Sequence, residues 1–157
     1  MIQRIQTLYY SLTAICLIIV SFGATIFAFD TKSDYYIYSS YGLQHFNGSH
    51  NLVDIKPGWL YLSTIALTLM CVMLILSYKN LARQFKLGRL ILLVYLIILI
   101  VVVASSFFGD KITGAQIISS KMGAGFFIFV AGFPFVFLGN LGVKRDKKLL
   151  DSLNRLR

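Results

Sequence analysis

Residues 90–103 read LILLVYLIILIVVV. Every position except Tyr95 carries an aliphatic side chain, and the next charged residue along the chain is Asp110. Each aliphatic side chain favours insertion into a bilayer by about 0.3–0.6 kcal/mol, so the stretch as a whole favours insertion by roughly 4–8 kcal/mol. This stretch therefore predicts a membrane-spanning helix.

The composition of the whole chain agrees with a membrane protein. Of its 157 residues, 57% are hydrophobic and 13% are charged, whereas about a quarter of the residues in a soluble domain are charged. The chain has two prolines, two cysteines and no low-complexity tract, which argues against a disordered protein and against a small scaffold held together by disulfides.

Four stretches lack Asp, Glu, Lys and Arg over the roughly 20 residues that a helix needs to cross a bilayer. They are residues 5–29, 57–78, 90–109 and 122–143. Because lipid offers the backbone no hydrogen-bond partner, each stretch is expected to be helical. The expected fold is an all-α integral membrane protein, in which residues 1–157 form a single transmembrane domain, a bundle of four transmembrane helices.

Positive charge predicts the orientation of these spans, because Lys and Arg near the ends of spans stay in the cytoplasm. One side of the membrane carries the whole net charge of +9, because on the other side the number of lysines equals the number of aspartates. Both termini are therefore expected in the cytoplasm. The basic residues of this cytoplasmic face are Arg4, Lys79, Arg83, Lys86, Arg89, Lys144, Arg145, Lys147, Lys148, Arg155 and Arg157.

The cytoplasmic tail, residues 144–157, combines basic residues with an apolar stripe that contains Leu149, Leu150, Leu153 and Leu156. This pattern predicts an amphipathic helix on the membrane surface. We expect the basic face from Lys79 to Arg157 to contact anionic lipid, because each basic residue near anionic headgroups contributes about 1 kcal/mol. An acidic protein or RNA, such as a membrane-docked ribosome, is the alternative partner, and DNA is not expected.

The outer loop, residues 30–56, contains Asn47-Gly48, a signal for a type I′ β-hairpin turn. A two-residue turn there would pair His45 with His50 and place two histidines side by side. Leu43 would then pair with Leu52. A metal site usually needs three or four ligands, so we expect two exposed loop histidines and no metal site.

The predicted spans contain no Asp, Glu, Lys, Arg or His, the residues on which proton relays and ion-coupled transporters depend. The sequence also offers no Ser-His-acid set, no CxxC pair and no phosphate-binding loop. We therefore expect no catalytic residues, no cofactor and no enzymatic activity.

The fourth predicted span carries Gly125, Gly132 and Gly139 at intervals of seven, so these glycines are expected to form a groove along one helix face. Small residues commonly mark contacts between transmembrane helices. We expect the groove to pack against other spans of the same chain, and a docking face for another subunit is the alternative.

The chain opens with MIQRIQT at residues 1–7, leaves the second predicted span through YKN at residues 78–80 and ends with DSLNRLR at residues 151–157. With these motifs the chain resembles, over its whole length, an uncharacterised four-span inner-membrane family of Bacteroidota. The resemblance implies a four-span bacterial membrane protein without an established activity, and it provides no functional residues to carry over.

Two functions are compatible with this sequence. The first is a non-enzymatic accessory or scaffolding subunit of a larger inner-membrane complex, which the lack of polar chemistry, the glycine groove and the basic tail favour. The alternative is a small lipid or hydrophobic-solute carrier acting as an oligomer, with a path lined by the hydroxyl groups of Thr13, Thr64 and Thr68.

Overall fold

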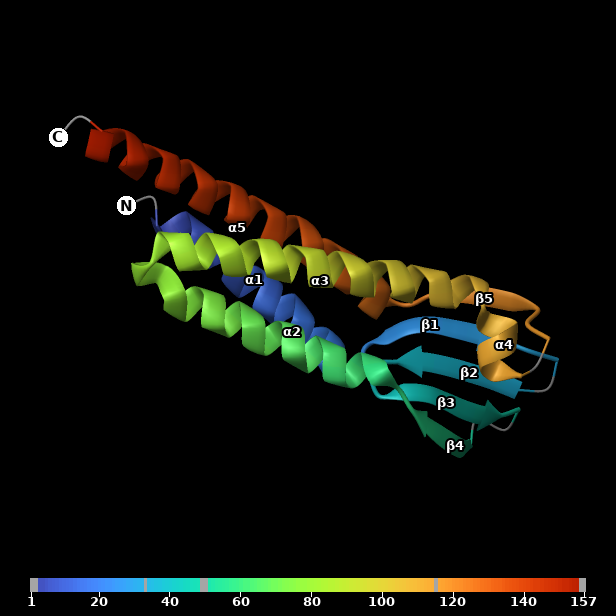
Figure 1. Cartoon of the computed structure of the whole chain (residues 1–157). Coiled ribbons are helices and arrows are strands. Elements are labelled where there is room, and N and C mark those ends of the chain that lie inside the picture. The colour runs from blue at the N-terminus through green and yellow to red at the C-terminus, as the bar shows by residue number, and fades with distance from the viewer. Residues whose placement is uncertain (1–2, 33, 49–50, 115, 156–157) are drawn as a thin grey trace.

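The computed structural model describes residues 3–32, 34–48, 51–114 and 116–155. Long helices form one part of the molecule, and a β-sheet lies at one end of them (Figure 1). The helices are α1 (Gln3–Ser21), α2 (Trp59–Leu76), the 3₁₀ turn η1 (Ser77–Lys79), α3 (Leu81–Phe107), α4 (Gly109–Thr113) and α5 (Ala124–Arg155). The strands are β1 (Thr25–Asp30), β2 (Asp34–Ser39), β3 (Gly42–Asn47), β4 (Leu52–Pro57) and β5 (Ser119–Met122).

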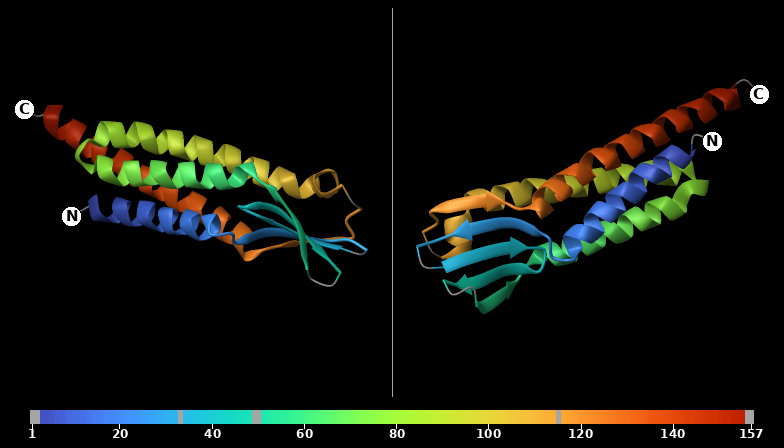
Figure 2. Two further views of the ribbon diagram at one scale, coloured as in Figure 1. Left: turned by 90° about the horizontal axis from the view of Figure 1, so that it is seen from below. Right: turned by 180° about the vertical axis from the view of Figure 1, so that it is seen from behind.

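The four long helices pack side by side: α1 contacts α2 and α5, and α3 contacts the same two helices. Large side chains fill the space between them, and Tyr10, Leu17, Leu67, Tyr95 and Phe129 are all fully or almost fully buried. Helix α1 begins and helix α5 ends away from the sheet, so the two ends of the chain lie at the same end of the molecule (Figures 1 and 2). We call this the terminal end, and the opposite end the sheet end.

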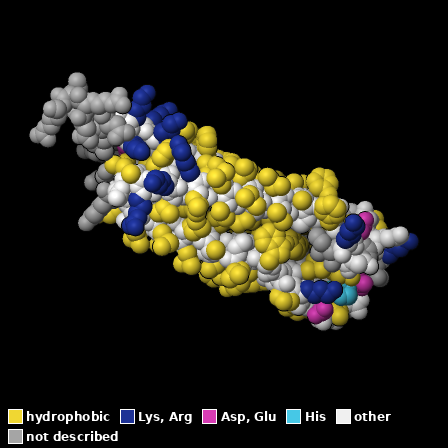
Figure 3. All heavy atoms as spheres, in the orientation of Figure 1, with side chains coloured by type: hydrophobic (Ala, Val, Ile, Leu, Met, Phe, Trp, Pro, Cys, Tyr) yellow, Lys and Arg dark blue, Asp and Glu magenta, His cyan; other side chains and the backbone are white. Residues whose placement is uncertain are grey.

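Three of the described helices are long and apolar enough to cross a membrane, namely α2, α3 and the part Ala124–Leu149 of α5. The apolar part of α1, Ile5–Ser21, is shorter. Hydrophobic side chains cover the middle of the visible helical face, whereas Lys and Arg gather toward the terminal end (Figure 3). An apolar belt of this kind between two polar ends matches the pattern expected of a membrane-embedded surface.

The sheet is antiparallel throughout, with the strand order β4-β3-β2-β1-β5. Strands β1–β4 follow one another along the chain, and β5 joins from the segment between α4 and α5. The two segments predicted to lie outside the membrane, together with residues 25–29 of the first predicted span, thus combine into one sheet. An all-α fold was therefore a wrong expectation, because the chain contains a five-stranded sheet as well as helices.

The end of the first predicted span accounts for part of this error. Residues 25–29 were expected to complete a helix, yet they form most of β1, and α1 already ends at Ser21. Strand β1 lies inside the sheet between β2 and β5, and Ile26, Phe27 and Phe29 are almost fully buried. A strand buried on both faces has a continuous apolar sequence, which hydropathy alone does not distinguish from a helix.

The predicted hairpin register is also wrong. Leu43 pairs with Lys56 instead of Leu52, and His45 pairs with Asp54. The connection between β3 and β4 is longer than a two-residue turn, since the Asn47 N–H donates to the Asn51 carbonyl oxygen and the register shifts between His45 and Phe46. His50 lies outside the described residues.

Two further helix boundaries differ from the hydropathy pattern. Helix α3 begins at Leu81 because the Asn80 side chain accepts a hydrogen bond from the Arg83 N–H, which caps the helix ahead of its basic residues. Helix α5 continues through Pro134 and Val143 to Arg155. The tail therefore extends the last long helix and is not a separate surface helix.

Candidate functional site

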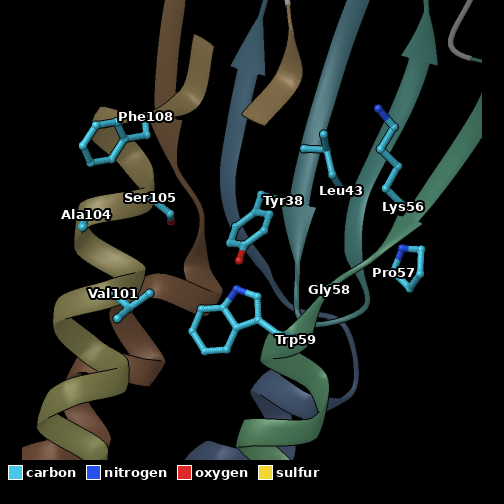
Figure 4. Close-up of a pocket in the computed structure, with 10 residues that line it drawn as sticks. All are labelled: Tyr38, Leu43, Lys56, Pro57, Gly58, Trp59, Val101, Ala104, Ser105 and Phe108. Atoms are coloured by element: carbon cyan, nitrogen blue, oxygen red, sulfur yellow. The ribbon is translucent and has the colours of Figure 1, made fainter. Parts of the chain in front are cut away.

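An apolar cavity lies where the sheet meets the adjacent ends of α2 and α3 (Figure 4). Its volume is about 400 Å³, within the range of small-ligand pockets. We call it the junction pocket. The residues that line it are Tyr38, Leu43, Lys56, Pro57, Gly58, Trp59, Val101, Ala104, Ser105 and Phe108.

A tight passage from β4 into α2 positions one wall of this pocket. The Gly58 N–H donates to the Tyr41 carbonyl oxygen, and Gly58 lies close against Gly42 of β3, where a larger side chain would not fit. Pro57 has no N–H to offer, which suits the last position of an edge strand. Helix α2 therefore begins directly at Trp59, whose side chain borders the pocket.

The polar groups of the junction pocket are hydroxyl groups and an indole N–H. Tyr38 of β2 points its hydroxyl toward Trp59, and Val101 and Ser105 project from α3 toward these two rings (Figure 4). Burial raises the pKa of the Tyr38 hydroxyl, so this group stays protonated and able to donate a hydrogen bond at neutral pH. The pocket is thus mainly apolar, with a few hydrogen-bonding groups at one side.

A smaller cavity of about 70 Å³ lies beside the junction pocket, and Leu43 and Lys56 line both. The smaller cavity has polar walls, which include His45 and Asp54. The Lys56 side chain runs along the sheet away from Trp59 (Figure 4). An apolar space and a polar space therefore adjoin each other at the position of Lys56.

His45 is held in place by two neighbours on the sheet. Its ring stacks on Tyr36 with centroids 4.5 Å apart, and its Nε2 lies 3.4 Å from an Asp34 carboxylate oxygen. Among the described residues, no group of three or more His, Cys, Asp or Glu side chains comes together in a way that could hold a metal ion. Hydrogen bonding and charge are the interactions that this polar cavity offers.

The structure gathers the predicted basic residues at the terminal end (Figure 3). Arg83, Lys86 and Arg89 are exposed on α3. On α5, Lys144, Arg145 and Lys148 are exposed and Lys147 is half-buried. Lys79 lies in η1 and Arg155 ends α5, but their side chains are outside the described part, as is the whole of Arg157.

The glycines of the last long helix lie against other parts of the same chain. A Cβ on Gly125 would lie 2.7 Å from the Thr25 carbonyl oxygen, and one on Gly139 would lie 2.6 Å from the Tyr10 ring. At Gly132 it would lie 2.3 Å from the Tyr95 hydroxyl oxygen. Gly132 and Gly139 thus allow α5 to approach α3 and α1 closely, and Gly125 allows it to approach the start of β1.

The hydroxyl groups expected to line a transport path bond to main-chain carbonyl groups instead. Thr13 donates to Tyr9, Thr64 to Tyr61 and Thr68 to Thr64, each within its own helix. The cavities described above are lined by other residues. The hydroxyl groups of Tyr38 and Ser105 border the junction pocket, and a transport path lined by the three threonines stays a prediction.

Sequence reasoning missed the junction pocket because residues from four separate segments form it. A signal was nonetheless present in Pro57-Gly58-Trp59, where a turn leads directly into an interfacial aromatic residue.

A family model described as a domain of unknown function, DUF4293, matches residues 2–156. The chain belongs to the DUF4293 family. No curated protein matches the chain. Membership of DUF4293 agrees with the resemblance to an uncharacterised family, while the number of spans and the bacterial group stay predictions.

Proposed function

We propose that this DUF4293 protein is a non-enzymatic membrane protein that binds one amphipathic lipid in the junction pocket. The observation that carries the proposal is the pair of adjoining cavities, one apolar and one polar, which share Leu43 and Lys56. A ligand that fills both needs an apolar part and a polar headgroup. A membrane lipid has both, and the pocket lies where the apolar helices α2 and α3 meet the sheet.

The charge of Lys56 favours an anionic headgroup. In this arrangement the apolar part of the lipid lies against Val101 and Trp59, and the headgroup lies between Lys56 and His45. The hydroxyl group of Tyr38 and the indole N–H of Trp59 are hydrogen-bond donors within the junction pocket. Aromatic side chains of this kind are favoured at membrane interfaces.

The same proposal includes a membrane topology. Helices α2, α3 and α5 span the bacterial inner membrane, and α1 is a fourth, shorter span. The basic terminal end lies in the cytoplasm, and the sheet lies on the opposite side. The common location of the two chain ends and the concentration of basic side chains there support this orientation.

Trp59 is the single tryptophan of the chain and borders the pocket, so its fluorescence reports on occupancy. Titrating the detergent-solubilised protein with short-chain phosphatidylglycerol should shift the Trp59 emission in a saturable way. Ser105→Phe fills the pocket and should abolish the saturable shift. Lys56→Gln should weaken binding of phosphatidylglycerol more than binding of phosphatidylcholine.

Ser106→Phe is the matched control, because Ser106 is the next residue of α3, is also half-buried and does not line the pocket. Its hydroxyl group donates to the carbonyl of its own helix, as that of Ser105 does. Equal shifts in both variants, or no saturable shift in the unmodified protein, would count against lipid binding at this site.

An accessory subunit of a larger inner-membrane complex is the second candidate function, and the exposed edge strand β4 favours it. All six residues of β4 are exposed, including Leu52, Val53 and Ile55. An unpaired strand edge can add a strand from another protein. A photocrosslinker placed at Val53 in cells should then capture a partner that the same crosslinker at exposed Lys32 does not capture.

A further inference from the structure

Two basic side chains from different helices meet over one aromatic ring at the terminal end. The guanidinium carbon of Arg89 in α3 lies 4.1 Å from the centroid of the Phe85 ring, and the Lys147 Nζ of α5 lies 5.8 Å from the same centroid. Phe85 itself is partly buried and packs against the hydrophobic core. The ring thus holds two cations in defined positions through cation–π attraction.

The two like charges lie close enough to repel each other. Both distances to one centroid limit their separation to about 10 Å, which is comparable to the screening length at physiological salt. Among the described side chains, the ion pair Asp30–Lys121 and the contact between Asp34 and His45 both lie in the sheet. In the described part of the chain, no carboxylate therefore forms an ion pair with Arg89 or Lys147.

The described carboxylate nearest to Lys147 along α5 is that of Asp146, and it is bonded elsewhere. It accepts a hydrogen bond from the side-chain amide of Gln6 in α1. An anion that lies between Arg89 and Lys147 would relieve their repulsion and gain two charge-assisted contacts.

The position of this pair along the helices matches the headgroup layer of a membrane. Arg89 directly precedes the apolar stretch that begins at Leu90, and Lys147 follows the last apolar turns of α5. Leu93 and Ile97 lie four and eight residues after Arg89, on the same side of α3, and each is 60% exposed. An apolar strip therefore leads from Arg89 into the belt.

We propose that Arg89 and Lys147 bind the phosphate group of an anionic phospholipid, with an acyl chain along Leu93 and Ile97. Phe85 is the platform that fixes both cations. The apolar strip favours a lipid over a free phosphate ion, an RNA or an acidic protein, because only the lipid uses the phosphate site and the strip together. This site is at the opposite end from the junction pocket, so variants of Arg89, Lys147 and Phe85 test it separately from the proposed function, which variants of Lys56 and Ser105 test.

Native mass spectrometry of the full chain in detergent tests this proposal by measuring which lipid stays bound when phosphatidylglycerol and phosphatidylcholine are offered at equal concentration. The unmodified protein should retain phosphatidylglycerol preferentially. Arg89→Gln and Lys147→Gln should each reduce that preference about fivefold, as expected from the loss of one basic residue at a headgroup. Phe85→Leu keeps the apolar packing and should also reduce the preference, because it removes the platform.

Lys148→Gln is the matched control, since it removes an equal charge from the neighbouring exposed position of α5. This variant should keep the preference within about twofold of the unmodified protein, as expected for a charge without a specific contact. An equal loss in Lys148→Gln and Lys147→Gln would overturn the proposal in favour of diffuse attraction. Displacement of phosphatidylglycerol by millimolar inorganic phosphate would overturn it in favour of a free-anion site.

Discussion

The hydroxyl group of Tyr95 in α3 donates a 2.7 Å hydrogen bond to the carbonyl oxygen of Phe129 in α5, and the two rings pack with centroids 4.9 Å apart. Gly132 makes room for the hydroxyl group, since a Cβ there would lie 2.3 Å from its oxygen. The one residue of the stretch 90–103 that is not aliphatic thus joins two long helices. Tyr95 is fully buried, so its hydroxyl group would be costly without this partner.

Replacing Tyr95 with Phe removes this hydrogen bond and keeps the ring contact. The expected loss of stability is about 0.6 kcal/mol and at most about 1.7 kcal/mol, the range measured for hydrogen bonds between transmembrane helices. Reversible unfolding in mixed detergent micelles measures it. Tyr61→Phe is the control, because Tyr61 is exposed on α2, and a loss of the same size there would contradict the role of the Tyr95 bond.

Gly139→Ala should destabilise the contact between α5 and α1. The added Cβ would lie 2.6 Å from the rigid ring of Tyr10, so the expected cost is about 1–3 kcal/mol, as for overpacked cores. Gly142→Ala is the control, because its Cβ would meet the flexible side chain of Gln6 at 2.8 Å. Thermal unfolding in detergent compares the two, and a larger loss in Gly142→Ala would contradict this packing.

Gly42→Ala should disturb the pairing of β3 with β4. Gly42 has a φ of +127°, and a Cβ there would lie 2.0 Å from the Lys56 carbonyl oxygen. Gly58 has an ordinary φ of −105°, so Gly58→Ala should cost less. A residue forced into such a backbone region costs about 1–3 kcal/mol. Hydrogen exchange of the β4 amides should therefore be faster in Gly42→Ala than in Gly58→Ala. Faster exchange in Gly58→Ala would contradict this prediction.

The pair Asp30–Lys121 should make the attachment of β5 depend on pH. An Asp30 carboxylate oxygen accepts hydrogen bonds from Lys121 at 3.0 Å and from Ser119 at 2.9 Å. These bonds lower the pKa of Asp30, and the hydrogen bond that Lys121 donates to Asp30 raises the pKa of Lys121. The contribution of Asp30 is therefore complete above its unfolded pKa and is lost as the pH falls through its lower folded pKa.

For Lys121 the sign is opposite: its contribution is complete below its unfolded pKa and is lost as the pH rises through its raised folded pKa. The thermal midpoint of the unmodified protein should thus decrease at both acidic and strongly basic pH. Asp30→Asn should flatten both limbs relative to the unmodified protein. The effect should be small, because the pair is at the surface, and identical pH profiles for the two proteins would refute it.

The apolar belt and the basic end follow from local sequence. Residues 90–103 are apolar enough to require burial in the hydrocarbon core of a membrane or in a protein core, and all of them lie in α3. By contrast, Thr25–Asp30 looked like the end of a span and is a strand. Its apolar side chains are compatible with a helix and with a buried strand. The segment is a strand because β2 and β5, from other parts of the chain, pair with it.

For the junction pocket and the Phe85 site, too, the sequence indicates some of the residues and only the tertiary structure shows the others. Lys56, Arg89 and Lys147 are recognisable as charged residues near the ends of apolar stretches. Their partners cannot be recognised in this way. Tyr38 and Ser105 are 67 positions apart in the sequence, too far for a local pattern to connect them. Phe85 meets Lys147 only because α3 packs on α5.

By itself, the sequence determined that long apolar helices form and that positive charge concentrates in residues 79–89 and 144–157, next to apolar stretches, because hydropathy and charge are properties of individual residues. The tertiary structure decided that the two segments outside the helices unite in one sheet, where the pockets lie and which cations share a ring. Those features arise from pairing between distant segments, and backbone hydrogen bonds and close packing select such pairs only when the whole chain is folded.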